Sequence, residues 1–311
     1  MILWLKPEFG PKVGYGHLSR LIAITEELVF RKHEYCFHFS ASDDPIANEI
    51  MRASGLSFGC RCNKFPNFLI IDSYNVDAKE LVSKMHPATK VLQIVDDVSP
   101  KFYADAYLQA SPISSWVPYN NSAAILEFIA SPILRKRFDS SDLVKSSKSS
   151  KNNKILISLG ASNAIEQIIN SIKVAVENSQ FHNHQIYCLL SGDNLNALRS
   201  FLLKNKIVPI KRGILVVDIA FDYDFVLTAC GVTAWEIVSS RIPCMVIGGA
   251  ENQRNQLNYF VNLKIADGLM FENQNDFVFS LTEKLNRFST PEIINELCNG
   301  RIRAVDWIES L

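Results

Sequence analysis

The chain has 311 residues, 48% of them hydrophobic, which is enough apolar material for two domains of about 150 residues each. Its 32 Lys and Arg residues cancel 32 Asp and Glu, so the net charge gives no reason to expect nucleic acid or an anionic membrane as a partner. No apolar run approaches the roughly 20 residues that cross a bilayer, and the opening MILWLKPEFG is unlike a signal peptide. Seven cysteines without the spacing of a disulfide framework indicate reduced thiols. We therefore expect a cytoplasmic protein without stable membrane insertion.

The first part of the chain alternates strand-like and helix-like segments. Apolar runs predict strands at residues 1–5, 35–39, 68–72, 91–95 and 106–108. The run at 68–72 is apolar up to its final aspartate, which is typical of a strand buried on both faces. Apolar residues at helical spacing between 18 and 29, and a second helical pattern at 76–85, separate these strands. Alternation of this kind predicts a parallel sheet with helices on both sides.

A polar segment then divides the chain. Residues 139–154 are rich in Ser, Lys and Asn and poor in core-forming residues, so they predict a linker between a first domain at 1–138 and a second at 155–311. The alternation restarts with predicted strands at 155–159, 185–190, 214–217, 225–228 and 244–247, and helical patterns follow at 275–288 and 291–311. The last helix is a candidate to pack back on the first domain. Two doubly wound, Rossmann-like domains leave a cleft between their carboxyl edges, where we expect the ligand.

The first glycine-rich loop, G-Y-G-H-L-S-R at residues 14–20, joins the first predicted strand to the first helix. Ligands of open α/β sheets bind above the carboxyl ends of the strands, where this loop is expected. Gly14 and Gly16 let the backbone approach a ligand closely, and His17 can exchange a proton near neutral pH. Two interpretations remain open: a tight turn whose histidine only caps or packs, or a binding loop in which His17 is a general base.

A second loop, C-G-V-T-A-W-E at residues 230–236, has the composition of a helix start. Thr233 and Glu236 have the spacing of a capping box. The amides at the start of such a helix, from Gly231, Val232 and Thr233, can bind phosphate oxygens, and the Glu236 carboxylate can accept two ribose hydroxyls. An ordinary, well-capped helix is the alternative interpretation.

Two further segments carry polar groups at predicted strand ends. The turn at 160–163, with Gly160 and Ser162, offers a second helix start for the same diphosphate, or is an ordinary strand-to-helix turn. Asn252 and Gln253 follow the strand at 244–247, and their carboxamides suit sugar hydroxyls and acetamido groups. A polar helix cap explains them equally well.

No metal or cofactor is predicted. Asp222 and Asp224 spell the D-x-D of metal-dependent sugar transferases, but they introduce a strand. Histidine and cysteine pairs at strand spacing occur without a complete set of four ligands, so a zinc site is not expected.

Together these segments resemble the two-domain GT-B fold of nucleotide-sugar enzymes, and most closely the UDP-sugar hydrolases of pseudaminic acid biosynthesis, which are related to the glycosyltransferases that make lipid II. Residues 14–20 look like the family's G-x-G-H-x-x-R loop, and residues 70–74 resemble its strand-end D-H-Y motif. The Asp pair at 96–97 is similar to its D-D pair. The other similar segments are residues 230–236, 250–253 and 299–303, which look like its G-G-x-T-x-W-E, E/D-N-Q and D-G-x-G-x-R motifs.

The resemblance implies metal-independent hydrolysis of a UDP-linked amino sugar, such as a UDP-2,4-diacetamido-2,4,6-trideoxyhexose, with inversion at the anomeric carbon. It implies that His17 is the base, that Tyr74 and Asn252 orient the sugar or the water, and that Arg20 contacts the substrate. The sequence departs from the family at Ser73, which replaces the histidine of D-H-Y, and around Lys6-Pro7-Glu8. It departs also at Asn163, where the family's G-G-[ST]-D loop ends in Asp, and in the stretch 108–119, which lacks the family's asparagine. A GT-B glycosyltransferase with a UDP-sugar donor and a catalytically inactive nucleotide-sugar-binding protein are the alternatives.

Overall fold

The computed structural model describes fifteen segments of the chain: residues 1–10, 13–37, 44–56, 65–73, 83, 85–95, 104–110, 125–129, 131–138, 153–159, 164–190, 192–211, 216–249, 253–288 and 299–311. It divides into two compact units. The first comprises residues 1–140 together with 296–311, and the second comprises residues 141–295. Most of the predicted linker, residues 139–152, and most of the helical pattern at 76–85 lie outside the described segments.

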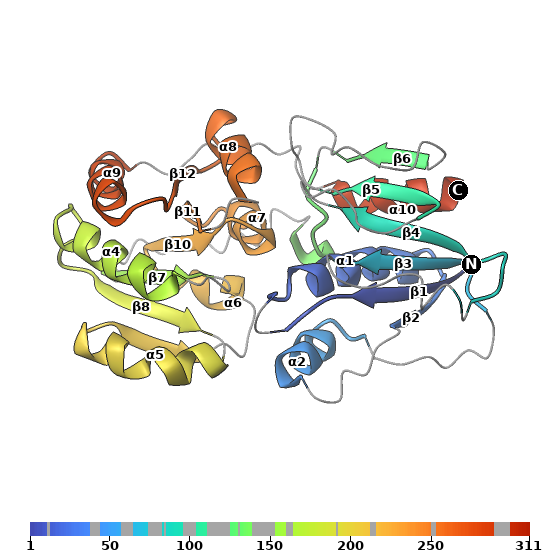
Figure 1. Ribbon diagram of the computed structural model, residues 1–311, viewed down its shortest axis with the longest axis horizontal. Coiled ribbons are helices and arrows are strands. Elements are labelled where there is room, and N and C mark those ends of the chain that lie inside the picture. Colours follow the sequence, from blue (N-terminus) through green and yellow to red (C-terminus); the bar gives the residue numbers. More distant parts are fainter. Residues whose placement is uncertain are drawn as a thin grey trace. The chain divides into compact units, whose positions relative to one another are not determined.

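The first unit is built on a six-stranded parallel sheet in the order β2-β1-β3-β4-β5-β6 (Figure 1). Its strands are β1 (Ile2–Pro7), β2 (Glu34–Phe37), β3 (Phe68–Asp72), β4 (Lys90–Val95), β5 (Ala106–Gln109) and β6 (Ile125–Phe128). Its helices are α1 (Gly16–Phe30), α2 (Pro45–Ala53) and α10 (Gly300–Ser310), with a 3-10 turn, η1, at Lys136–Phe138. Every residue of β3 is buried, as expected for a central strand that is covered on both faces.

Helix α10 completes the core of the first unit, although it comes from the far end of the sequence. Ala304, Val305 and Ile308 share one apolar cluster with α1 and the strands, and the red helix lies among the blue and teal elements in Figure 1. A buried ion pair ties the two helices, since Arg301 Nε donates to Glu27 Oε2 over 3.2 Å. The first unit is therefore discontinuous in sequence.

The start of α10 leaves no room for a side chain at Gly300. A Cβ atom there would lie 2.3 Å from the backbone oxygen of Pro132. Helix propensity alone favours alanine over glycine by about 1 kcal/mol, but the contact with rigid backbone forces the helix to shift. We expect Gly300→Ala to lower the free energy of unfolding of the first unit by roughly 1–3 kcal/mol in chemical denaturation.

The control for this prediction is Ile302→Ala, an exposed position on the same helix. It should change stability by less than about 0.5 kcal/mol. A Gly300→Ala protein as stable as the wild type would contradict the steric argument.

The second unit has its own six-stranded parallel sheet in the order β12-β11-β10-β7-β8-β9. Its strands are β7 (Lys154–Ser158), β8 (Gln185–Leu190), β9 (Val208–Lys211), β10 (Phe225–Ala229), β11 (Cys244–Gly248) and β12 (Asp267–Met270). Its helices are α4 (Ile165–Glu177), α5 (Gly192–Lys204), α6 (Val216–Ala220), α7 (Val232–Ser239), α8 (Arg254–Asn262) and α9 (Gln274–Asn286). Read from β9, this is the strand order of the Rossmann fold. The first sheet begins β2-β1-β3, the order of the other common doubly wound fold, so both units are doubly wound α/β domains.

One predicted strand is wrong. Residues 216 and 217 of the strand expected at 214–217 lie in helix α6, and the edge strand is β9, which precedes them. Val216, Val217 and Ala220 are buried, which is the spacing of a short amphipathic helix. A short apolar run does not distinguish helix from strand, and here the helical alternative holds.

Each sheet reverses its strand order at one point, and ligands of open α/β sheets bind there. In the first unit the reversal lies between the carboxyl ends of β1 and β3. In the second it lies between β7 and β10. The chain leaves β1 toward α1 and leaves β10 toward α7, so both predicted loops emerge at these points.

Candidate active site

Two glycines, Gly10 and Gly14, pair through their backbones between β1 and α1. The Gly14 amide donates to the Gly10 oxygen over 2.7 Å, and the Gly10 amide donates back to the Gly14 oxygen over 3.1 Å. Gly14 has a φ of +87°, in a region that residues with a side chain rarely adopt. Gly14 is therefore required by the turn itself. Helix α1 begins at Gly16, which places His17 in its first turn.

Tyr15 anchors this loop to helix α2. Its hydroxyl donates to the Asp44 carboxylate, with distances of 3.0 and 3.2 Å to the two oxygens. The same carboxylate caps α2, because Asp44 Oδ1 accepts from the amides of Ile46 and Ala47 at 2.9 Å. The sequence pattern did not predict the contact between Tyr15 and Asp44. This contact fixes the backbone immediately before His17.

His17, Arg20 and Asp72 form a buried cluster at the point where the first sheet reverses. His17 Nδ1 lies 2.6 Å from Asp72 Oδ1. Arg20 donates from Nε to Asp72 Oδ2 over 2.7 Å and from Nη2 to Asp72 Oδ1 over 2.6 Å. The exposed fractions of His17, Arg20 and Asp72 are 7%, 6% and 0%. His17 and Arg20 are three residues apart on α1 and share one face of the helix, which is how both reach the end of β3.

The charge state of Asp72 follows from this cluster. Burial alone would raise the pKa of the Asp72 carboxyl, but the charge of Arg20, the charge of His17 and the hydrogen bonds from both hold that pKa below its usual range. Asp72 is therefore an acceptor throughout the physiological pH range.

An ionised Asp72 fixes the tautomer of His17. Arg20 Nη2 also lies 3.2 Å from His17 Nδ1, but it donates to Asp72 Oδ1 over the shorter distance of 2.6 Å. Two atoms that only accept hydrogen bonds do not approach to 2.6 Å, so we assign the proton of the neutral ring to Nδ1, which donates it to Asp72. The ring therefore carries its lone pair on Nε2. This is the arrangement in which a carboxylate orients a histidine as a base.

Arg20 holds this arrangement in place. Its bidentate contact with Asp72 satisfies a buried carboxylate that would otherwise be costly. The substrate contact predicted for Arg20 stays a prediction, and positioning of Asp72 is a role that the sequence analysis missed. The signal was present in the i, i+3 spacing of His17 and Arg20 on one helix face.

The start of α7 differs from the prediction. The helix begins at Val232 with Gly231 as its N-cap, and no side chain caps it, so the capping box expected from Thr233 and Glu236 is wrong. Thr233 lies inside the first turn, two positions after the N-cap. Val232 and Thr233 thus contribute first-turn amides at the carboxyl end of β10, and Glu236 is buried in the next turn.

The remaining predicted site residues divide into two groups. Gln253 precedes α8 and accepts a hydrogen bond at Oε1 from the amide of Gly249, the residue that follows β11, over 2.8 Å. Tyr74, Gly160, Ser162 and Asn252 lie outside the described residues. Their predicted roles stay predictions.

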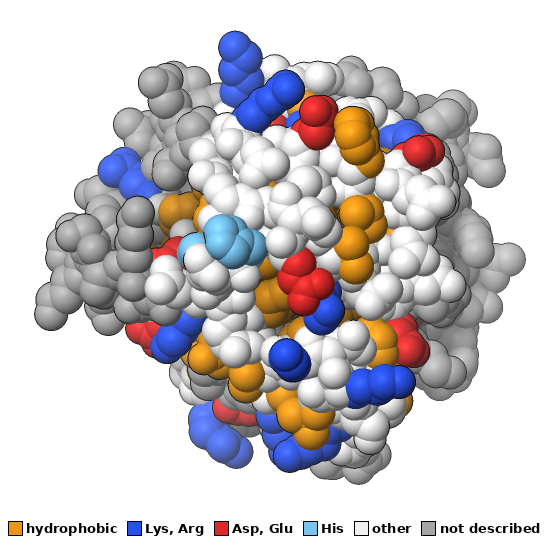
Figure 2. All heavy atoms as spheres, turned by 90° about the vertical axis from the view of Figure 1, so that its left-hand side faces the viewer, with side chains coloured by type: hydrophobic (Ala, Val, Ile, Leu, Met, Phe, Trp, Pro, Cys, Tyr) orange, Lys and Arg blue, Asp and Glu red, His pale blue; other side chains and the backbone are white. Residues whose placement is uncertain are grey.

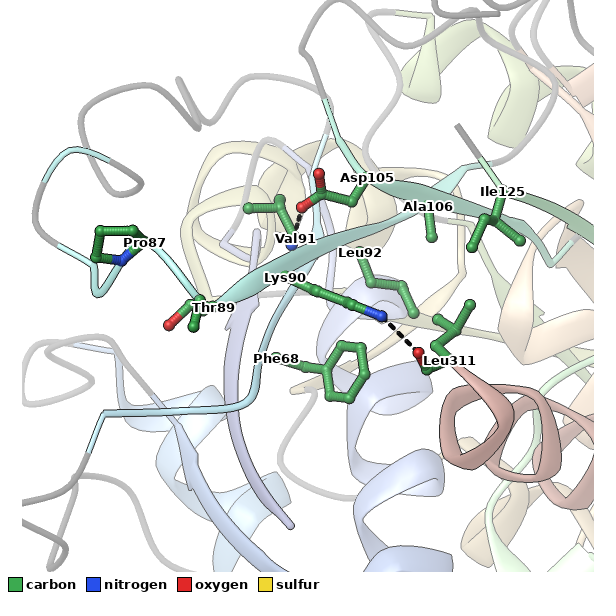
Figure 3. A pocket seen from close by; sticks show the side chains of 11 residues that line it. Phe68, Pro87, Thr89, Lys90, Val91, Leu92, Asp105, Ala106, Ile125 and Leu311 are labelled. Atoms are coloured by element: carbon green, nitrogen blue, oxygen red, sulfur yellow. Dashed lines mark hydrogen bonds between the residues drawn. The ribbon is translucent and has the colours of Figure 1, made fainter. Parts of the chain in front are cut away.

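A cavity of about 330 Å³ opens at the opposite edge of the first sheet (Figure 3). It lies at the amino ends of β4, β5 and β6 and is lined by Phe68, Leu92 and Ile125 with Lys90 at its rim. The Lys90 ammonium donates to the Leu311 oxygen, as the dashed line in Figure 3 shows. Because His17 and Asp72 lie at the carboxyl edge, this cavity is separate from the candidate active site.

Other features of the described residues bear on partners. Within the described segments, no group of three or more His, Cys, Asp and Glu side chains is placed to hold a metal ion. None of the helices described is long and apolar enough to span a bilayer. On the face of the second unit in Figure 2, Lys and Arg side chains are interspersed with Asp and Glu.

Comparisons with known proteins identify solved structures of the same architecture. No protein-family profile matches the sequence, and no curated protein matches it. Solved structures do match. The UDP-GlcNAc 2-epimerase of Methanocaldococcus jannaschii in complex with UDP-GlcNAc and UDP is 13% identical, with a TM-score of 0.65 and coverage of 100% of both chains. The S. aureus MnaA–UDP structure is 11% identical, with a TM-score of 0.63 and coverage of 99% of this chain and 95% of that one. The Acinetobacter baumannii MurG structure is 10% identical, with a TM-score of 0.53 and coverage of 100% and 99%.

The fold is GT-B. The two parallel-sheet units are the two Rossmann-like domains of that fold, and the match extends over the full length of both chains rather than over one domain. At 10–13% identity these matches define the architecture of the chain.

Proposed function

We propose that this chain is an enzyme that hydrolyses a UDP-linked amino sugar to UDP and the free sugar. The observation that carries the proposal is His17, which Asp72 orients so that Nε2 is the basic nitrogen, at the point where the first sheet reverses. A buried and oriented imidazole at a ligand-binding edge is suited to take a proton from water. The UDP-bound structures among the GT-B neighbours support the choice of nucleotide.

In the proposed reaction, water attacks the anomeric carbon as the bond from that carbon to the UDP oxygen breaks. The water proton passes to His17 Nε2, and the bonding electrons leave with UDP. General-base catalysis supplies only about 10²–10⁴ in rate, so the larger contribution must come from stabilising the charge that grows on UDP. We assign this to the amides of Gly231, Val232 and Thr233, with those near Gly160 and Ser162, and propose that no metal takes part. Attack opposite the leaving group inverts the anomeric carbon.

The finer assignment follows the motif resemblance: a UDP-2,4-diacetamido-2,4,6-trideoxyhexose as substrate, in pseudaminic acid biosynthesis. Tyr74 and Asn252 would orient the sugar or the water. The test is a screen of UDP-sugars for UDP release in water, followed by identification of the free sugar. Release that depends on an added acceptor would exclude hydrolysis.

The second candidate is a glycosyltransferase with a UDP-sugar donor. The same oriented His17 could take the proton of an acceptor hydroxyl, and a MurG and a rhamnosyltransferase are among the structural neighbours. Incubation with and without acceptor alcohols separates the two reactions. Tight binding of a UDP-sugar without any UDP release would identify a catalytically inactive binding protein.

A substitution at Gly231 tests the proposal that the amides at the start of α7 bind the diphosphate. Its backbone is extended, with a φ of 171°, and a Cβ atom there would meet nothing within 4 Å, so alanine fits the fold. A methyl group at the helix start would still keep a diphosphate from the amides of α7. We expect Gly231→Ala to weaken UDP binding about tenfold, or about 1.4 kcal/mol, by calorimetry, with an unchanged melting temperature.

Ser239→Ala, at the other end of α7, is the matched control and should leave UDP affinity unchanged. Equal UDP affinity in Gly231→Ala and the wild type would mean that this turn is only a helix start.

A further inference from the structure

A second polar pair lies beside the His17–Asp72 pair, on the opposite face of the same strand end. Ser73 follows Asp72 directly, and its hydroxyl donates to Glu8 Oε2 over 2.8 Å. The alternation of side chains along β3 turns Asp72 toward α1 and Ser73 toward the other face. The two pairs thus occupy adjacent residues at the carboxyl end of β3.

Hydrogen bonds to backbone oxygens fix the positions of Glu8 and Ser73. The Glu8 amide donates to the Asp72 oxygen over 2.8 Å, which extends the pairing of β1 with β3 by one residue. The side chain of Gln93 on β4 donates from Nε2 to the backbone oxygen of Ser73 over 3.4 Å. Ser73 and Gln93 are buried, whereas Glu8 is partly exposed. A fixed hydroxyl therefore orients a carboxylate that solvent, or a ligand, can reach.

The chemistry of Glu8 restricts what it can bind. A carboxylate repels a diphosphate, so Glu8 is not suited to the charged part of a nucleotide sugar. It accepts hydrogen bonds from neutral donors such as hydroxyl and amide N–H groups.

We propose that Glu8, oriented by Ser73, is the subsite that binds the sugar of the substrate, through its hydroxyl or acetamido N–H groups. The inference rests on the proposed function, because it assumes a nucleotide sugar at this edge. Ser73 donates to Glu8, so we expect the two side chains to act together in binding the sugar.

The test compares UDP with a panel of UDP-GlcNAc, UDP-GalNAc and UDP-glucose by calorimetry. The wild type should bind at least one UDP-sugar more tightly than UDP. In Glu8→Ala this gain should fall about tenfold or more, as expected for a hydrogen bond to a charged group, while UDP affinity is unchanged. Ser73→Ala should reduce the gain less, because it removes the hydroxyl that orients the carboxylate and leaves the carboxylate in place. Glu34→Gln, an exposed glutamate at the amino end of β2, is the control.

The outcomes separate this inference from the proposed reaction. If the wild type releases no UDP but Glu8→Ala loses the sugar-dependent gain, the reaction is wrong and the subsite stands. If UDP is released and Glu8→Ala keeps the full gain, the subsite is wrong. Loss of UDP affinity in Glu8→Ala would assign Glu8 to the nucleotide and overturn the inference, as would a wild type that prefers none of the UDP-sugars to UDP.

Discussion

Replacing His17 by alanine is expected to lower the rate of UDP release by roughly 10²–10⁴-fold, the usual contribution of a general base. The affinity for UDP should change little, since the diphosphate is assigned to the amides of the second unit. The reason is specific to Nε2: Asp72 occupies Nδ1 at 2.6 Å, so only the other nitrogen is oriented to take a proton. Single-turnover rates with saturating UDP-sugar, measured beside UDP binding by calorimetry, separate catalysis from affinity.

The control is His86→Asn, an exposed histidine at the amino edge of the same sheet. It should retain the wild-type rate. An undiminished rate in His17→Ala would end the assignment of the base, and an equal fall in UDP affinity would show that His17 holds the ligand instead.

Asp72→Asn is expected to destabilise the first unit by about 3–5 kcal/mol, because it removes the ionised acceptor from the buried, bidentate contact between Arg20 and Asp72. Hydrogen exchange at the amides of β1 and β3 reports this unit directly. Asp306→Asn is the matched control: Asp306 also pairs with an arginine, Arg31, but its side chain is 59% exposed. It should cost less than about 1 kcal/mol.

The same variant should change how stability depends on pH. The pKa of Asp72 is lowered in the folded protein, so between that value and the unfolded value of about 3.9 the unfolded chain binds more protons. The contribution of Asp72 is therefore complete above the unfolded pKa and is lost as the pH falls through the folded one. Wild-type stability should fall on acidification below about pH 5, and less steeply in Asp72→Asn. Parallel pH profiles, or a loss no larger than in Asp306→Asn, would rule out a stabilising ion pair.

The interior of each sheet could be predicted from the sequence. Continuous apolar runs are the pattern of strands buried on both faces, and the strands expected at 68–72, 91–95 and 225–228 are confirmed as β3, β4 and β10. The strands that were not predicted, β6, β9 and β12, all lie at sheet edges. Edge strands are short and half-exposed, and β9 contains a proline while β12 contains a glycine, so their patterns are weak.

The candidate site could be predicted only in part. The glycine turn and the helix after it placed His17 above the carboxyl edge of the first sheet, since both depend on local sequence. The Arg20–Asp72 contact joins residues 52 positions apart, and the pairing of Ser73 with Glu8 joins residues 65 apart. Contacts of this kind depend on which strands are neighbours, which local patterns do not specify. The start of α7 at Val232 differed from the predicted capping box, because the helix begins with Gly231 as its N-cap and without a side-chain cap.

The packing of α10 in the first unit determines the order in which the two units can complete their folding during synthesis. Synthesis proceeds from the amino terminus, so residues 141–295 leave the ribosome before the helix that carries Ala304, Val305 and Ile308. The second unit is continuous and can fold as soon as it emerges. The apolar face of the first unit that packs against Ala304, Val305 and Ile308 is therefore covered only after the whole second unit has been synthesised.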